Sequence, residues 1–167
     1  PYHLFFSESM TSAALSMRDA AGLASSDALS TYLERRAEAL VQGRYALSDA
    51  AWHALEAPAV DVLIGPMNTG EDRLLGVKDA AAGVVLHRNE EKSQHLARLL
   101  APLPDRRAAI GLDALVPPRP VPTQRWGAYD ALYVTGGLNT GPKATVLPLS
   151  PTGPRRLLLT NVIRARA

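Results

Sequence analysis

The sequence contains no cysteine among its 167 residues. This absence excludes disulfide bonds, zinc sites built on thiolates and a cysteine nucleophile. Long apolar runs are missing too, because no stretch approaches the roughly 20 residues that a membrane-spanning helix needs. The opening PYHLFFSES lacks the basic segment of a secretory signal peptide. We therefore expect a soluble protein without a membrane partner, in the cytoplasm or the periplasm.

The sequence also has no large excess of charge of either sign. Lysine and arginine number 18 against 16 acidic residues, for a net charge of +2. The arginines are scattered, and RRLLLTNVIRARA at 155–167 is the one dense basic cluster. A nucleic-acid-binding domain normally carries a basic face or stripe, so we expect no nucleic-acid partner. The 47% hydrophobic and 20% charged residues are ordinary for a globular domain with a core.

The sequence lacks the signatures of a catalytic centre of its own. GGLNTGPK at 136–143 resembles a phosphate-binding loop, but Pro142 takes the place of the lysine and Ala144 offers no hydroxyl, so we interpret it as a hairpin turn. The four histidines form no His-Glu-x-x-His pair, and no Gly-x-Ser-x-Gly elbow occurs. We predict no catalytic residue and no metal site in this chain, although the residues alone leave a Ser-His-Asp triad open.

Residues 1–57 are predicted to form a helical segment. Apolar residues at helical spacing predict one helix with Ser7 or Ser9 as N-cap and Gly22 as its end, and a second from Ser26, as N-cap, to Gly43. A third, short helix is expected to begin at Ser48 and to stop before Pro58. We interpret the apolar stripes of these helices as core.

Residues 58–167 have a different pattern, which predicts strands. Strands are expected at 60–64, 81–87, 129–135, 143–147 and 157–162, with Gly65-Pro66 ending the first. Asn89 is expected to cap a helix through Leu100 with an apolar face of Leu96, Leu99 and Leu100, and VPPRPVP at 116–122 is expected to be an extended connector. The fold class is therefore α+β: N-terminal helices followed by a small, mostly antiparallel five-stranded β-barrel or sheet with one intervening helix.

Three segments, in this order and spacing, resemble a known family. They are TYLERRAEALVQGRYALSDAAWHAL, VDVLIGPMNTGEDRLLGVKDAAAGVVLHR and YDALYVTGG followed by VLPLSPTGPRRLLLTNVI. Together they are similar to the middle region of the dipeptidyl-peptidase III family of zinc metallopeptidases, and in particular of its shorter bacterial members. The most specific pieces are Ser48-Asp49-x-x-Trp52, Ile64-Gly65-Pro66 followed by Glu71-Asp72, and the Leu-Leu-x-Asn-Val run at 158–162.

This resemblance implies a two-lobed metallopeptidase. In the family, one helical lobe holds zinc on a His-Glu-x-x-Gly-His helix, and the other contains a small β-barrel that binds the peptide as an added strand. This chain corresponds to the barrel lobe with its flanking helices. It is therefore expected to contain no zinc ligand, to need zinc and the zinc-binding lobe from residues outside 1–167, and to hydrolyse no peptide alone. Pro1 and the closing NVIRARA also suggest a piece of a longer chain.

The resemblance also implies a substrate-binding set, which is altered here. Asp61 matches the family's acid on the strand, where a carboxylate suits a peptide's terminal ammonium. Leu63 replaces a usual tyrosine, and Met67 to Asp72 replaces Tyr-Glu-Thr-Tyr-Glu-Asp. A further asparagine-rich segment has become Val146-Leu147-Pro148-Leu149-Ser150. The predicted substrate-binding positions are Asp61, Leu63, Asn68, Glu71, Asp72, Val146 and Leu149.

Two functions follow from this set. The first is the substrate-binding lobe of a peptidase whose dipeptidase activity is altered or lost. The alternative is a non-catalytic peptide- or protein-binding module that keeps the fold. In either case the surface that would face a missing lobe is expected to expose apolar residues and to allow self-association.

Overall fold

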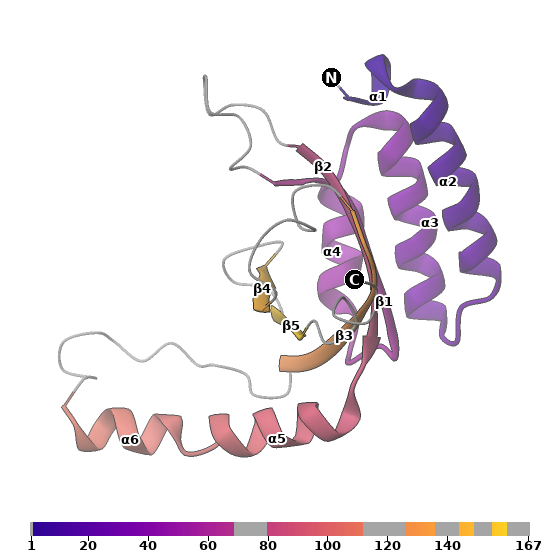
Figure 1. Ribbon diagram of the computed structural model, residues 1–167. Coiled ribbons are helices and arrows are strands. Elements are labelled where there is room, and N and C mark those ends of the chain that lie inside the picture. The colour runs from indigo at the N-terminus through magenta and orange to yellow at the C-terminus, as the bar shows by residue number, and fades with distance from the viewer. Residues whose placement is uncertain (1, 69–79, 112–125, 136–143, 149–154, 160–167) are drawn as a thin grey trace, which may run out of the picture. The chain divides into compact units, whose positions relative to one another are not determined.

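The computed structural model describes residues 2–68, 80–111, 126–135, 144–148 and 155–159 (Figure 1). The connector predicted at 116–122 and the turn predicted at 136–143 lie outside these residues. The helices are α1 (Tyr2–Phe5), α2 (Ser7–Gly22), α3 (Asp27–Gln42), α4 (Ala46–Ala54), α5 (Glu90–Leu100) and α6 (Leu103–Ala109). The strands are β1 (Val60–Asn68), β2 (Ala80–Arg88), β3 (Trp126–Val134), β4 (Ala144–Pro148) and β5 (Arg155–Leu159).

The predicted α+β class is confirmed, and the described strands have an open order. They are arranged as β1-β2-β3-β5-β4, so β1 and β4 stand at the two ends. β4 pairs with β5 in the antiparallel sense, whereas β5 runs parallel to β3. The bonds from the Arg88 amide to the Ala59 carbonyl and from the Thr135 amide to the Gly83 carbonyl fit antiparallel pairing of β1 with β2 and of β2 with β3. Closure of the strands into a barrel is not seen among the described residues.

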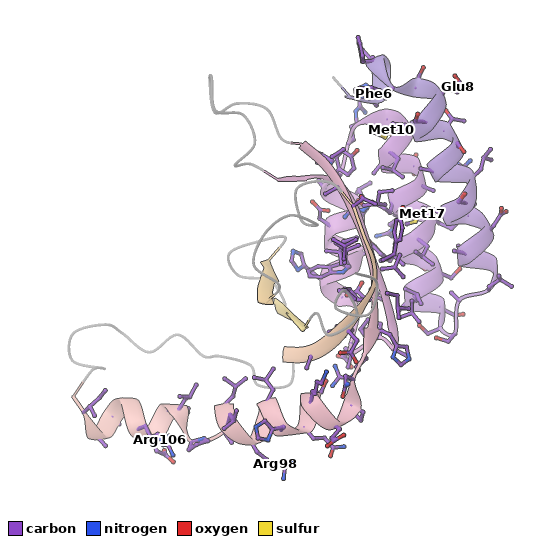
Figure 2. The ribbon with its side chains drawn as sticks, viewed as in Figure 1. Phe6, Glu8, Met10, Met17, Arg98 and Arg106 are labelled. Carbon is purple, nitrogen blue, oxygen red and sulfur yellow. The ribbon has the colours of Figure 1, made fainter. Side chains whose placement is uncertain are left out.

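The caps of α3 are correctly predicted. The Ser26 hydroxyl accepts a hydrogen bond from the Leu29 amide, and Gly43 ends the helix at φ 70°, in the left-handed region that favours glycine. The apolar stripe of α3 is buried, with Tyr32 and Leu40 at 0% exposure. α2 lies beside α3, and Figure 2 shows Met10 and Met17 on the α3 side of α2.

Other boundaries of the N-terminal helices differ from the prediction. The prediction that Ser7 or Ser9 caps α2 is wrong: Ser7 is the first residue of the helix, Phe6 holds the N-cap position without a side-chain hydrogen bond, and α1 precedes it. The third helix, α4, begins at Ala46 rather than Ser48. Ser48 does not cap it, because its hydroxyl donates a hydrogen bond back to the Tyr45 carbonyl at 2.8 Å.

β1 continues through the Gly65-Pro66 turn that was predicted to end it. In the antiparallel ladder, the bond between Arg88 and Ala59 directs the backbone groups of odd-numbered β1 residues toward β2. Those of Val62, Ile64 and Pro66 therefore face away from β2. Proline has no amide hydrogen, and at this position none is needed for the ladder.

The chain divides into two compact units. The first comprises residues 1–58, 62–84 and 133–141, and the second comprises 59–61, 85–132 and 142–167. In the first unit the largest fully buried side chains include Trp52, Tyr32 and Leu63, and in the second Tyr129 and Leu86 are fully buried. Each unit therefore contains buried apolar residues of its own.

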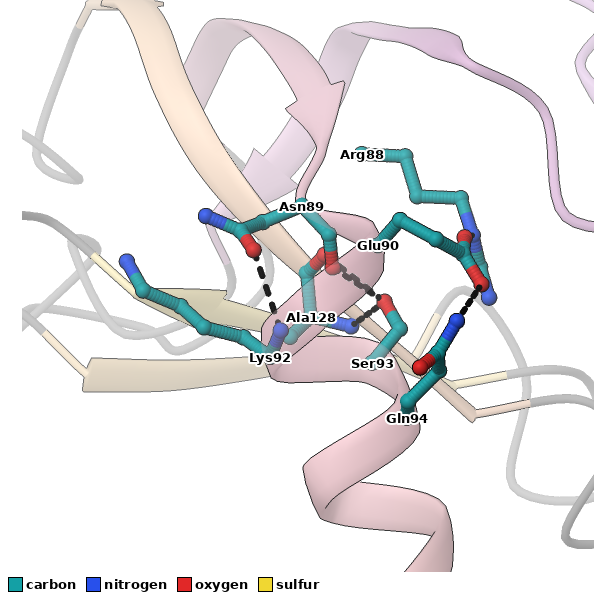
Figure 3. Close-up of polar contacts among 7 residues, drawn as sticks. All are labelled: Arg88, Asn89, Glu90, Lys92, Ser93, Gln94 and Ala128. Carbon is teal, nitrogen blue, oxygen red and sulfur yellow. Dashed lines mark hydrogen bonds and ion pairs between the residues drawn. The ribbon is translucent and has the colours of Figure 1, made fainter.

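The first turn of α5 is joined to β3 by polar contacts (Figure 3). The Asn89 side chain accepts a hydrogen bond from the Lys92 amide, which confirms its predicted capping role. Ser93 is 3% exposed, and its hydroxyl accepts from the Ala128 amide at 3.0 Å and donates to the Asn89 carbonyl at 2.7 Å. The Ser93 hydroxyl thereby gives the buried Ala128 amide of β3 an acceptor at a position beyond the end of β2.

Asp130 of β3 completes this junction. Its carboxylate accepts hydrogen bonds from the side-chain Nδ2 of Asn89 at 2.8 Å and from the Lys92 ammonium at 2.9 Å. Burial works to raise the pKa of Asp130, but these two hydrogen bonds, together with the charges of Lys92 and His87, outweigh it, and the pKa lies below its ordinary value. Asp130 is therefore a structural acid whose ionised form is favoured.

The predicted apolar face of the helix after Asn89 is only partly covered. Leu96 and Leu100 are half-buried, Leu99 is 57% exposed, and Ser93 is the one buried side chain of α5. A second helix, α6, follows where one intervening helix was expected, and its Leu103 is 40% exposed. No helix among the described residues is long and apolar enough to cross a membrane.

Candidate functional site

The first unit supports β1 through a tyrosine of α3. Tyr32 is fully buried, and its hydroxyl donates a hydrogen bond to the Val62 carbonyl. That carbonyl is one of the β1 groups that face away from β2. Because a helix side chain already occupies this acceptor, the outer side of β1 at Val62 is closed to an incoming strand.

A buried arginine ties Tyr32 to α4. Arg36 is 3% exposed, and its guanidinium contacts the Asp49 carboxylate at 2.5 Å. The same guanidinium lies over the Tyr32 ring at 5.6 Å and the Tyr45 ring at 5.3 Å. The charge is therefore held by one carboxylate and two aromatic faces. Its Nε is buried and has no hydrogen-bond partner among the described residues.

Tyr45 connects this cluster to β1 at Gly65. Gly65 has a φ of 140°, and a Cβ at this position would lie 3.1 Å from the Tyr45 ring. Both the backbone conformation and the close approach of the ring require glycine. Burial raises the pKa of Tyr45; the charge of Arg36 opposes this shift and that of Asp49 adds to it.

An apolar hollow of about 210 Å³ lies in the first unit beside Gly65 of β1. It contains few polar groups, and Thr135 is one of them. The Thr135 hydroxyl accepts a hydrogen bond from the Gly83 amide at 2.9 Å. The hollow is lined by Ser9, Met10, Ala13, Leu40, Ile64, Gly65, Ala81, Ala82, Gly83 and Thr135.

In the second unit, β4 has an open side. It pairs with β5 from Ala144↔Leu159 to Pro148↔Arg155 and has no second strand neighbour in the described order. In an antiparallel pair, alternate residues direct their backbone groups to the partner strand and the others direct theirs away. About half of the β4 backbone groups therefore face away from β5, and no described strand pairs with them.

The structure describes four of the seven predicted substrate-binding residues. Asp61 and Leu63 are both fully buried in β1, on the same face because side chains alternate along a strand. Asn68 is the last residue of β1, and Val146 is the central residue of β4, opposite Leu157. β1 and β4 occupy opposite ends of the strand order. Glu71, Asp72 and Leu149 lie outside the described residues.

The described residues do not fit a zinc site. They contain no group of three or more histidine, cysteine, aspartate or glutamate side chains that could hold a metal ion. Zinc needs three or four such ligands around one point. No chemical step involving a metal can therefore be derived from this part of the chain.

Sequence reasoning missed the residues that hold β1 in place. Tyr32 was assigned only to the buried stripe of α3, and Arg36 and Tyr45 were given no role. A helical signal was available for Arg36, since it lies four residues after Tyr32 and is therefore on the same helix face. Nothing in the sequence indicated the approach of Tyr45 to Gly65.

Comparison with solved structures gives matches over nearly the whole chain. The structure of dipeptidyl-peptidase III from Caldithrix abyssi has a TM-score of 0.77 and 25% identity, and the match covers 99% of this chain and 33% of that protein. Dipeptidyl-peptidase III from Corallococcus sp. strain EGB has a TM-score of 0.72 and 26% identity, over 95% of this chain and 31% of that one. The chain thus spans about a third of the proteins it matches.

The sequence comparisons are less extensive. Nudix hydrolase 3 from Arabidopsis thaliana is 35% identical over 78 residues, which are 47% of this chain and 10% of that protein. No protein-family model matches the chain. The resemblance predicted from the three sequence segments is confirmed by the structural matches.

Proposed function

We propose that this chain, which is dipeptidyl-peptidase-III-like over nearly its whole length, is the substrate-binding lobe of a zinc-dependent metallopeptidase of that kind. The observation that carries this proposal is the match over 99% of the chain at a TM-score of 0.77. In this proposal the peptide binds to the β-strands of the lobe, which close into a small barrel, while zinc and its ligands lie outside residues 1–167. The chain alone then binds peptide without cleaving it.

Two features of the strands support β4 as the strand to which the peptide adds. The outer side of β1 is closed at Val62 by the Tyr32 hydroxyl, whereas β4 has an open side in the described order. Strand addition derives its affinity from main-chain hydrogen bonds, each contributing about 0.5–1.5 kcal/mol. β4 has five residues and ends at Pro148, which has no amide hydrogen. The added peptide therefore forms only a few such bonds and is short.

The substitutions in the predicted set support weaker or altered peptide capture. Val146 and Leu149 replace family asparagines, and an amide that loses its partner in a buried site costs about 1–3 kcal/mol. This loss keeps the alternative open: a module that retains the fold and binds peptide or protein without belonging to an active peptidase. The Nudix hydrolase match supports neither reading, since it covers 10% of that protein and less than half of this chain.

Recognition of the peptide's amino terminus is assigned to Asp61. Asp61→Asn is expected to weaken binding of a short peptide with a free amino terminus by about tenfold, as a charge-assisted hydrogen bond becomes a neutral one. Binding of the N-acetylated peptide should change little. Calorimetric titration with both peptides gives the ratio of their dissociation constants.

Asp130→Asn is the matched control, since Asp130 has assigned protein partners in Asn89 and Lys92. Asp130→Asn should lower the stability of the chain without changing the ratio of the dissociation constants for the free and the acetylated peptide. Equal losses of both peptides in Asp61→Asn would remove Asp61 from amino-terminus recognition. Failure of the unsubstituted chain to bind either peptide would contradict the proposed function itself.

A further inference from the structure

Helices α5 and α6 expose an apolar stripe. Leu96, Leu99, Leu100 and Leu103 have the spacing of one helix face, and we call them the α5–α6 stripe. Leu99 is 57% and Leu103 40% exposed, Leu96 and Leu100 are half-buried, and Ile110 just beyond α6 is 76% exposed. Among the side chains described in the two helices only Ser93 is buried. Figure 2 shows Arg98 and Arg106 directed outward from the same two helices.

Such a stripe differs from those of the N-terminal helices. The stripe of α3 is buried along its length, and Ser26 and Gly43 cap that helix. α5 has 11 residues and α6 has seven. Helices shorter than about 12–15 residues are marginal in water without packing of an apolar face. α5 is held to β3 at its first turn, but no described residue covers Leu99 or Leu103, so this part of the stripe lacks the packing that normally stabilises short helices.

We propose that the α5–α6 stripe docks against an apolar surface of the same longer protein, contributed by residues outside 1–167. This inference rests on the proposed function, in which the chain is one lobe of a protein about three times its length. The Caldithrix abyssi match covers 99% of this chain, so it includes α5 and α6, yet it covers only 33% of that protein. The two helices thus have counterparts in a protein with two further thirds of chain available to cover them.

Hydrogen exchange at residues 90–109 tests this docking. In the longer protein, exchange across α5 and α6 should be at least about tenfold slower than in the 167-residue chain, because the covered helices open less often. In the longer protein, Leu99→Asp should return exchange at 90–109 toward the rate of the 167-residue chain. Gln94→Asp is the matched control: it introduces the same charge on the opposite side of α5 and should leave the slow exchange unchanged.

The possible outcomes separate the two proposals. Equal exchange in both forms would overturn the docking and leave the peptide-binding role intact. Slow exchange that appears only at high concentration of the 167-residue chain, and that Leu99→Asp abolishes, would assign the stripe to a second copy and overturn the inference. A gene product that ends at residue 167 would contradict both proposals.

Discussion

Replacing Trp52 with alanine is expected to lower the free energy of unfolding by about 3–5 kcal/mol. Trp52 of α4 is the largest of the fully buried side chains that the structure describes, so its removal leaves a large cavity. The surrounding helices can collapse only in part, so the cost includes both lost transfer free energy and the cavity. Denaturant unfolding followed by circular dichroism measures the difference.

Leu47→Ala is the control for Trp52→Ala, because Leu47 lies on the same helix and is 71% exposed. Its effect should stay within about 0.5 kcal/mol. If Trp52→Ala does not fold, Trp52→Phe keeps most of the buried ring and should show a smaller loss in the same direction. If neither Trp52 variant lowers the free energy of unfolding, Trp52 does not belong to the core of the first unit.

Asp49→Ala is expected to cost about 3 kcal/mol, because it leaves a buried guanidinium without its carboxylate. The Arg36 side chain is 4% exposed and that of Asp49 is 35% exposed, so water reaches only the acid. Arg36 would retain the two tyrosine rings but no ionic partner. The loss should extend to β1, since Tyr32 and Tyr45 contact both Arg36 and the strand.

An exposed ion pair provides the comparison for Asp49→Ala. Arg18 and Glu34 approach at 3.9 Å with side chains 50% and 54% exposed, and Glu34→Ala should cost less than about 1 kcal/mol. Adding Arg36→Met to Asp49→Ala should recover part of the loss, because the unpaired charge disappears. An Asp49→Ala effect as small as that of Glu34→Ala would show that the pair does not hold the cluster together.

Local signals in the sequence were sufficient to predict the helix ends that depend on nearby residues. Ser26, Gly43 and Asn89 cap helices through bonds to residues within a single turn, so their effect is visible in the sequence. The α+β order of helices and strands followed from the change in pattern at Pro58. These features require no knowledge of contacts between distant residues.

The features that the sequence did not predict depend on tertiary contacts. β1 passes through Gly65 and Pro66 because the Tyr45 ring packs on the glycine and the outer side of the strand needs no proline amide. Ser48 looked like a cap, but its hydroxyl bonds to the Tyr45 carbonyl. The stripe of α5 has the pattern of a buried face, and pattern alone cannot distinguish burial within 1–167 from burial elsewhere.

The candidate site was predicted mainly from the family resemblance. Asp61 and Leu63 were correctly assigned to a strand, and their burial could not be read from strand alternation alone. The role of Tyr32 at the outer side of β1 depends on a contact across 30 positions in sequence. Such a contact leaves no trace in a single sequence, and this is why the difference between the two sheet edges emerged only from the structure.

The most direct test of the account is hydrogen exchange at the β4 amides, residues 144–148, with and without a short peptide that has a free amino terminus. The 167-residue chain is used, with a chelator present throughout. The account predicts slower exchange at β4 when peptide is added, because an added strand pairs with the open side of β4 and needs no metal. Exchange at β4 that does not respond to peptide, or that responds only when zinc replaces the chelator, would contradict it.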